Sequence, residues 1–245
     1  MFKLEVKDLC QSFDDKMILE CLNLYVKEQE MVSIIGPSGV GKSTLFNIIA
    51  GLLHPTKGDV LLDGQSIIDQ PGKVSYMLQK DLLLPFKTIE QNVALPLILK
   101  NRGKKEALKQ ANDLLAEFNL ASVSKSYPKE LSGGMRQRIA LLRTYLFSSN
   151  LILLDEPFSA LDAFTKDEIH HWYLNIHKKL RLTTLFITHD IDEAIKLSDR
   201  IYILKSGCGK DFKCVTVDKE ALTSDQFELS DEFLQYKRRL IEKLN

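Results

Sequence analysis

Nine consecutive residues near the N-terminus have the types and the spacing of a site for a phosphate group. They follow the pattern G-x-x-x-x-G-K-S, and the members are Gly36, Pro37, Ser38, Gly39, Val40, Gly41, Lys42, Ser43 and Thr44. Glycines let the backbone curl so that several N–H groups point at one anion. Lys42 adds a full positive charge for the β- and γ-phosphates of a nucleotide, and the Ser43 hydroxyl is a ligand for Mg²⁺. The pattern therefore predicts a phosphate-binding loop, called here the P-loop.

The segments on either side of the P-loop have the periodicities that such a loop requires. The apolar run of residues 31–35 predicts a buried strand before it, and residues 45–50 predict the start of a helix after it. The N-terminus of a helix carries a partial positive charge, which adds to the attraction for phosphate. The alternative is a glycine-rich turn that happens to precede a lysine, and the strand–loop–helix context disfavours it.

Two adjacent carboxylates follow another apolar run. Residues 151–154 are all Leu or Ile, which predicts a central parallel strand, and Asp155 and Glu156 come directly after it. Sites in α/β proteins lie at the carboxyl ends of such strands. There Asp155 is suited to hold Mg²⁺ through water, and Glu156 is suited to polarise an attacking water molecule. Paired acids after a strand are also common without a ligand, and the P-loop makes that alternative much less favourable here.

Two single residues at strand ends are weaker candidates for the same site. Gln79 follows a strand predicted over residues 74–78, and His189 follows a strand predicted over residues 184–188. The Gln79 amide is suited to Mg²⁺ or to water near the phosphates, and the His189 ring is suited to a hydrogen bond with a γ-phosphate. A solvated loop residue is the alternative for each of them.

A second predicted helix start has the features of an anion site. Ser132 is predicted to cap a helix that continues through residues 139–142, and Gly133 and Gly134 begin that helix. Two glycines at a helix start expose backbone N–H groups to an anion. Taken alone, these three residues are better interpreted as a simple cap with a glycine turn.

The composition limits the classes of protein that fit. Lys plus Arg and Asp plus Glu each number 33, and this balance argues against a protein held on nucleic acid by bulk charge. The cysteines show no C-x-x-C spacing, which favours free thiols in a reducing compartment over disulfides or a zinc site. No signal peptide and no run of about 20 apolar residues occurs, so we expect a soluble, intracellular chain that reaches a membrane through a partner.

The remaining periodicities predict how the elements are organised. Residues 2–8 and 17–27 have the alternation of antiparallel strands, and helical signals replace strand signals over about residues 80–146. We expect residues 1–245 to form one α/β domain in which that segment is an inserted helical subdomain. Residues 206–245 are predicted to form a short C-terminal tail, with a strand over residues 212–217 and a helix over residues 226–240.

Taken together and in order, these residues resemble the ATP-binding subunits of ATP-binding-cassette (ABC) transporters. Residues 131–134 match the family's Leu-Ser-Gly-Gly signature, residues 151–156 are similar to its Walker B strand with the catalytic glutamate, and residues 159–162 are similar to its D-loop. The resemblance covers about residues 2–205. It implies an α/β P-loop NTPase fold, namely an ABC-type ATPase core with a mainly parallel sheet, an N-terminal antiparallel β region and an α-helical subdomain.

The resemblance also implies a role for each candidate residue, with ATP and Mg²⁺ as cofactors. The residues implied in catalysis are Lys42, Gln79, Glu156 and His189, and the implied metal ligands are Ser43, Gln79 and Asp155. ATP binding is implied for the nine P-loop residues and for Ser132, Gly133, Gly134, Asp162 and Phe13. Composition alone would assign Phe13 to the core, but it falls where the family stacks an aromatic ring on adenine.

The partners implied by the resemblance are a second copy of the chain and separate membrane subunits. Two chains of the family pack head to tail, so that ATP lies between the P-loop of one and the signature of the other. Residues 83–93 and 131–138 are most similar to importer ATPases for nitrate, sulfonates and taurine. This implies permease subunits that contact residues 79–93, beginning at Gln79, a separate solute-binding protein, and a location on the cytoplasmic face of the cell membrane. No nucleic-acid partner is expected.

Two other classes of protein fit less well. A non-transport ABC ATPase that acts in DNA repair usually carries a long coiled-coil or zinc insertion, and one that acts in translation usually carries two cassettes. This sequence has neither feature. A P-loop kinase or GTPase is disfavoured by the Leu-Ser-Gly-Gly segment and by His189, and the chain contains no Asn-Lys-x-Asp segment for guanine.

Overall fold

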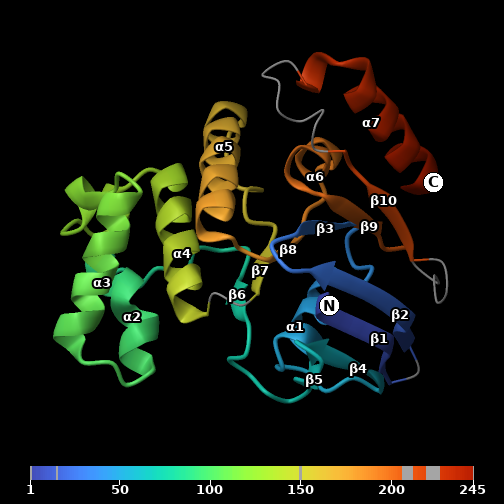
Figure 1. The fold of residues 1–245 in the computed structure, drawn as a ribbon, viewed down its shortest axis with the longest axis horizontal. Coiled ribbons are helices and arrows are strands. Elements are labelled where there is room, and N and C mark those ends of the chain that lie inside the picture. Colours follow the sequence, from blue (N-terminus) through green and yellow to red (C-terminus); the bar gives the residue numbers. More distant parts are fainter. Residues whose placement is uncertain (1, 15, 149–150, 206–211, 219–226, 245) are drawn as a thin grey trace.

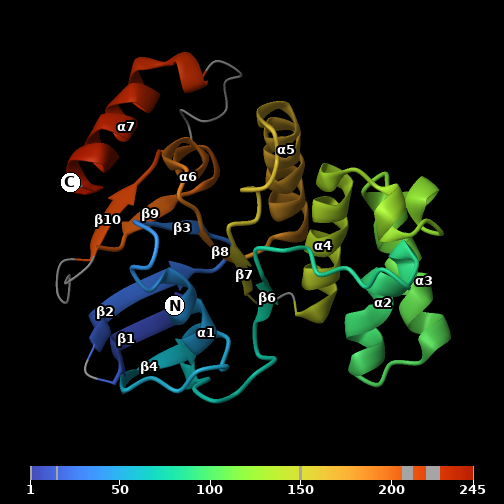
Figure 2. The same cartoon turned by 180° about the vertical axis from the view of Figure 1, so that it is seen from behind.

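The computed structural model describes residues 2–14, 16–148, 151–205, 212–218 and 227–244, which form two sheets and surrounding helices (Figure 1). The two sheets lie together in one half of the molecule. Helices α2, α3 and α4 stand on the other side, as the view from behind also shows (Figure 2).

The first sheet is antiparallel and has the strand order β2-β1-β4-β5. Its strands are β1 (Phe2–Phe13), β2 (Lys16–Lys27), β4 (Lys57–Leu62) and β5 (Gln65–Ser66). Leu4 and Val6 of β1 are buried while Lys7 is exposed, as the alternation predicts. The predicted antiparallel region is confirmed, but β1 extends past residue 8 because its pairing with β2 continues to Phe13.

The second sheet is mainly parallel, as predicted, and has the strand order β10-β9-β3-β8-β7-β6. Its parallel strands are β3 (Met31–Ile35), β6 (Ser75–Met77), β7 (Ile152–Asp155), β8 (Thr184–Ile187) and β9 (Arg200–Ile203), and β10 (Lys213–Thr216) runs antiparallel to β9. Every residue of β3, β7 and β8 is buried, as expected for parallel strands covered on both faces. Because these three strands are neighbours, their carboxyl ends meet at one edge of the sheet.

Helices cover both faces of the parallel sheet. On one face, α1 (Lys42–Ile49) shares an apolar core with the antiparallel sheet and with Val32 and Ile34 of β3. On the other face, α5 (Ala163–Leu180) packs through Ile169 and Tyr173 in a core with Met31. The short helix α6 (Ile191–Leu197) lies on that same side, against Ile35 and β9.

Three α-helices lie in the segment that the sequence predicts to be helical. They are α2 (Ile89–Leu99), α3 (Lys104–Glu117) and α4 (Gly133–Phe147), with single 3₁₀ turns at Ala121–Val123 and Pro128–Glu130. The apolar face of α3 is buried at Ala107, Ala111, Leu114 and Leu115. Ser132 caps α4, as predicted, because its hydroxyl accepts a hydrogen bond from the Met135 N–H group.

The C-terminal helix starts later than the sequence predicts. α7 covers Asp231–Leu244, and a 3₁₀ turn at Phe227–Leu229 precedes it, whereas Gln226 lies outside the described residues. The Ser230 hydroxyl accepts a hydrogen bond from the Phe233 N–H group and sets the helix start there. Phe233 and Leu240 are buried against β9 and β10.

Three further features of the structure concern cysteines, histidines and membrane spans. Cys10, Cys21 and Cys214 are free thiols, and Cys208 lies outside the described residues. On α5, His170 and His177 are buried and His171 is exposed; within the described ranges no cluster of three or more His, Cys, Asp or Glu side chains is placed to hold a metal ion. No helix in the described part of the chain has both the length and the hydropathy needed to cross a membrane.

One buried carboxylate joins three segments of the helical region. Glu90, in the first turn of α2, accepts hydrogen bonds from Lys125 Nζ at 2.6 and 2.7 Å and from Asn112 Nδ2 at 2.8 Å. Burial raises the pKa of Glu90, but the hydrogen bonds from Lys125 and Asn112 outweigh it, so the pKa lies below its ordinary value of 4.5. The ionised carboxylate therefore stabilises the fold above that value, and this contribution is lost as the pH falls through the lowered pKa.

We expect Glu90→Gln to lower the free energy of unfolding at pH 7 by about 1.5–3 kcal/mol, the range for hydrogen bonds to a charged group. The deficit should shrink progressively as the pH falls below 4.5. Urea unfolding over a pH series measures this, and Glu106→Gln, at an exposed position of α3, is the control. A deficit that stayed constant down to complete protonation would show that the charge of Glu90 is not its source.

Candidate nucleotide site

The P-loop backbone adopts conformations that glycine accepts and that other residues would strain. Gly41, directly before α1, has a φ of +107°, and a Cβ atom there would lie 2.8 Å from Ile18 Cγ2. Gly39 has a φ of +78°. Both angles lie in the left-handed region that glycine adopts readily. The loop thus ends at the N-terminus of α1, the arrangement that suits an anion.

The Lys42 side chain turns back over the P-loop from the first position of α1. Its Nζ atom donates hydrogen bonds to the carbonyl oxygens of Gly36 at 2.7 Å and Pro37 at 2.8 Å. Burial lowers the pKa of Lys42, while the carboxylates of Glu156 and Asp155 oppose that shift. The ammonium group therefore lies where phosphate oxygens would compete with the loop carbonyls as hydrogen-bond acceptors.

A cavity of about 280 Å³ joins the P-loop to the end of the first hairpin. Phe13 at the end of β1 and Ile18 on β2 lie on one wall, and Glu156 lies with the P-loop residues. The lining residues are Phe13, Ile18, Ser38, Gly39, Gly41, Lys42, Ser43, Thr44 and Glu156. The predicted site residues Phe13 and Glu156 are thus brought together with the P-loop, whereas Val40 points into the core.

Asp155 lies at the end of β7 and contacts two hydroxyl groups. The Tyr76 hydroxyl donates to Asp155 Oδ2 at 3.3 Å, and Ser43 also forms a hydrogen bond with the carboxylate. Burial raises the pKa of Asp155 against the effect of these bonds, and burial likewise raises the pKa of Tyr76. A buried carboxylate beside the P-loop serine supplies the oxygen ligands that Mg²⁺ prefers, and a cation would offset the cost of its burial.

Two predicted site residues from distant parts of the sequence, Gln79 and His189, meet at Glu156. Gln79 Nε2 donates to Glu156 Oε2 at 3.0 Å, and His189 Nδ1 lies 3.4 Å from the same oxygen. Glu156 has a φ of +47°, an uncommon backbone conformation for a residue other than glycine. Its N–H group is fixed by a hydrogen bond to the Ile187 carbonyl of β8. Such strain at a fixed acidic residue is typical of a functional position.

The signature residues lie beside the D-loop and outside the P-loop cavity. A Cβ atom on Gly134 would lie 2.5 Å from Thr165 Cγ2, and one on Gly133 would lie 3.7 Å from Leu161 Cδ2. Asp162 caps α5 by accepting a hydrogen bond from the Thr165 N–H group at 3.1 Å. Neither Ser132 to Gly134 nor Asp162 lines the cavity, and α4 stands away from α1 in Figures 1 and 2.

Sequence reasoning missed two residues of this site, Ile18 and Tyr76. Ile18 faces the P-loop because β1 and β2 form a tight hairpin in which Phe13 pairs with Lys16. Tyr76 reaches Asp155 because β6 pairs in parallel with β7, placing Tyr76 opposite Leu153. A predicted pairing of these strands is the signal that would have found them.

A P-loop at a helix start, with an acid pair at the end of a nearby parallel strand, defines a P-loop nucleotide hydrolase. The model of the ABC transporter family matches residues 19–159. The aliphatic sulfonates import ATP-binding protein SsuB of Bacillus cereus is 39% identical over 226 residues, which are 92% of this chain and 88% of that protein. The formylaminopyrimidine import ATP-binding protein ThiZ of Halalkalibacterium halodurans is 47% identical over 186 residues, covering 76% of this chain and 72% of that protein.

A solved structure gives the same result for the fold. The dimeric post-hydrolysis state of the ATP-binding cassette MJ0796, bound to ADP and Pi, has a TM-score of 0.73 and 32% sequence identity, and the match covers 88% of this chain and 99% of that one. The chain therefore belongs to the ABC transporter family. It is an ATP-binding subunit of the kind found in importers, and its enzymatic activity is ATP hydrolysis.

Proposed function

We propose that this chain powers the import of a small organic or inorganic solute of the nitrate, sulfonate and taurine class through separate permease subunits. The main support for an ATP-driven process is that Gln79 and His189 contact Glu156, which lines the P-loop cavity. The similarity to a sulfonate importer subunit supports this class of solute. The similarity to a formylaminopyrimidine importer subunit makes a pyrimidine the alternative solute. A separate solute-binding protein would deliver the solute to the permease.

In the proposed mechanism each residue at the cavity has a distinct role. The P-loop N–H groups and Lys42 bind the phosphates, and Phe13 packs against the base. Ser43 and Asp155 would hold Mg²⁺, with Gln79 as a further ligand, and the bound ion would neutralise phosphate charge. Glu156 polarises the attacking water, and His189, beside the same carboxylate, donates a hydrogen bond to the γ-phosphate.

The site requires a second copy of the chain in this proposal. Ser132, Gly133 and Gly134 start a helix whose N–H groups suit an anion, yet they lie outside the P-loop cavity of their own chain. A head-to-tail dimer places them against the γ-phosphate held by the partner's P-loop. Asp162, which lies beside them, then belongs to the same interface. The dimeric state of the MJ0796 cassette supports this arrangement.

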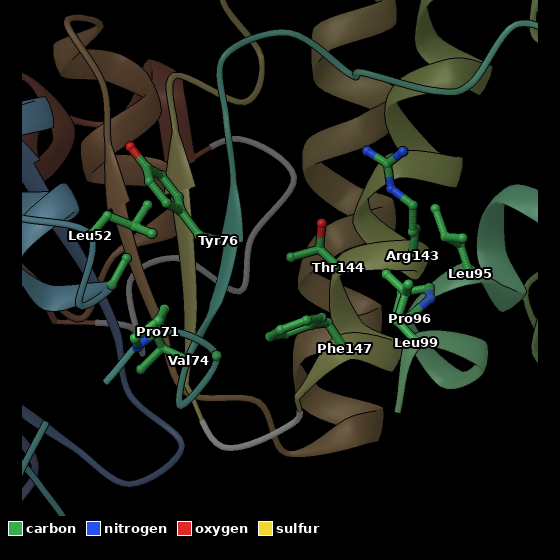
Figure 3. Close-up of a pocket in the computed structure, with 12 residues that line it drawn as sticks. Leu52, Pro71, Val74, Tyr76, Leu95, Pro96, Leu99, Arg143, Thr144 and Phe147 are labelled. Atoms are coloured by element: carbon green, nitrogen blue, oxygen red, sulfur yellow. The ribbon is translucent and has the colours of Figure 1, made fainter. Parts of the chain in front are cut away.

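The permease is proposed to dock on a groove between the parallel sheet and the helical region. A cavity of about 400 Å³ lies there, with Leu52, Val74 and Tyr76 on one side and Leu99 and Phe147 on the other (Figure 3). Its lining is mostly apolar, which suits the apolar face of a helix from the permease. Since Tyr76 lines this groove and also bonds Asp155, a docked helix would lie close to the nucleotide site.

The predicted contact segment, residues 79–93, is hydrogen-bonded to a residue that lines the groove. Arg143 lines the groove and donates through Nη1 to the Leu82 carbonyl at 2.8 Å, so the segment is fixed at the groove's rim. Burial lowers the pKa of Arg143, although the negative charge of Asp81 acts to raise it. Two apolar side chains of the segment remain exposed, with Leu82 at 53% and Phe86 at 72%. Exposed apolar residues beside an apolar groove are typical of a docking surface.

We expect Phe86→Asp to weaken association with the permease by about tenfold or more, because it places a charge at an aromatic contact. Its affinity for ATP should stay unchanged, since Phe86 does not line the P-loop cavity. The tagged chain is captured from solubilised membranes of its source, and the co-purifying membrane protein is quantified. The matched control is Leu229→Asp, which changes another exposed apolar residue, at 87% exposure.

The same preparation tests the proposed function. We expect a permease to be identified among the co-purified proteins. Proteoliposomes that contain it and this chain should take up taurine, an alkanesulfonate or nitrate when ATP is supplied. If Phe86→Asp retained as much permease as the wild type, the proposed docking surface would be rejected. Association with ribosomes or DNA in place of a membrane protein would support a non-transport ABC ATPase.

A further inference from the structure

A partly buried cluster of charged side chains joins α5 to α6. Lys166 Nζ, on α5, lies 2.9 Å from Asp190 Oδ2 and 3.6 Å from Glu193 Oε2. His170 Nε2, one turn further along α5, lies 3.5 Å from the same Glu193 oxygen. The side chain of Glu193 is only 2% exposed and that of Lys166 is 21% exposed. Removal of Lys166 would therefore leave two carboxylates facing one another with much of their compensating charge lost.

Asp190 directly follows His189 in the chain and is held by several hydrogen bonds. Asp190 Oδ1 accepts hydrogen bonds from the N–H groups of Asp192 at 3.0 Å and Glu193 at 3.2 Å, which caps α6. Its own N–H group donates to the Thr188 hydroxyl at 3.0 Å. One carboxylate oxygen thus fixes the helix start, and the other is bound by Lys166. A shift of Asp190 would carry the backbone of His189 with it.

Lys166 also lies one turn after Asp162, the N-cap of α5. This first turn contacts the signature helix as well, because Thr165 packs closely against Gly134. A single helical turn therefore connects the D-loop, the signature helix and the loop that carries His189. Burial tends to lower the pKa of Lys166, but its bonds to Asp190 and Glu193 raise it above its ordinary value, which keeps the ammonium charged.

We propose that Lys166 is a positioning residue that keeps the His189 loop at a fixed position relative to the D-loop. It would thereby support ATP hydrolysis without touching the nucleotide. This inference rests on the proposed role of His189. It predicts an effect on turnover and little effect on ATP binding, since Lys166 lies outside the P-loop cavity. A purely structural role would instead change stability alone.

The test compares two lysines that each join α5 to α6. Lys196 of α6 pairs with Asp167 of α5 at 3.1 Å and also with Glu228, and it has a similar exposure of 18%. Its ion pairs within the described residues do not include Asp190. We expect Lys166→Met to lower the kcat of ATP hydrolysis about tenfold with less than about a twofold change in KM, as for a small misplacement of a reacting group. Lys166→Arg should restore most of the activity, and Lys196→Met should keep the wild-type kcat. Melting temperatures of all three variants report their stability.

A double-mutant cycle with His189→Ala separates this inference from the proposed function. If Lys166 acts through His189, then Lys166→Met should add little further loss in a His189→Ala chain. Losses that multiply in the double variant would overturn the inference while leaving the role of His189 intact. Full activity of His189→Ala alone would reject the proposed role of His189. Equal losses of kcat in Lys166→Met and Lys196→Met would show that any ion pair between the two helices has the same effect, and would also overturn the inference.

Discussion

The Glu156→Gln variant is expected to hydrolyse ATP about 10²–10⁴-fold more slowly than the wild type while it still binds ATP. The amide keeps the size of the carboxylate and can still accept the hydrogen bond from Gln79. It loses the negative charge that would polarise an attacking water molecule. Steady-state phosphate release measures kcat, and calorimetric titration with ATP measures the affinity.

The control for this variant is Glu168→Gln, which removes an exposed carboxylate of α5 at 76% exposure. It should leave both kcat and the ATP affinity unchanged. Full activity of Glu156→Gln would exclude Glu156 as the residue that activates water. In that case Asp155, the other acid of the pair, would be the next candidate to test.

The Lys42→Ala variant is expected to lose ATP affinity by about 100-fold or more. The substitution removes the charge-assisted hydrogen bonds to the phosphates, which contribute about 1.5–3 kcal/mol each. It also leaves the carbonyls of Gly36 and Pro37 without their present donor. The affinity for ATP is measured by calorimetry, with circular dichroism to show that the variant is folded.

Lys105→Ala, at an exposed position on α3, is the matched control because it removes the same charge outside the cavity. Its ATP affinity should equal that of the wild type. An unchanged ATP affinity of folded Lys42→Ala would contradict the assignment of residues 36–44 as the phosphate-binding loop. Loss of ATP binding in both variants would show that the affinity depends on the net charge of the chain and not on a specific contact of Lys42.

Local patterns in the sequence were sufficient to predict the elements that hold the site. The buried strands β3, β7 and β8 are short and mainly apolar, and the P-loop, Asp155 and His189 lie at or just after their carboxyl ends. The Ser132 cap of α4 was also predictable, because a cap depends on a few neighbouring residues.

Features that depend on which elements become neighbours were not predictable from local patterns. Tyr76 meets Asp155 only because β6 pairs with β7, and Lys166 meets Asp190 only because α5 and α6 lie on the same side of the sheet. The predicted start of α7 at residue 226 was wrong, because a 3₁₀ turn and the Ser230 cap override the apolar periodicity around Phe227. Periodicity identifies the buried face of an element but not its partner.

We propose that the P-loop cavity is half of a site, which the Ser132 to Gly134 segment of a second chain completes. Sedimentation equilibrium of Glu156→Gln with Mg²⁺ and ATP, with and without the added substitution Ser132→Arg, tests it most directly. We expect a dimer for Glu156→Gln with ATP, a monomer with ADP, and a monomer for the double variant even though ATP remains bound. A dimer that persists with Ser132→Arg, or a Glu156→Gln chain that binds ATP and stays monomeric, would contradict it.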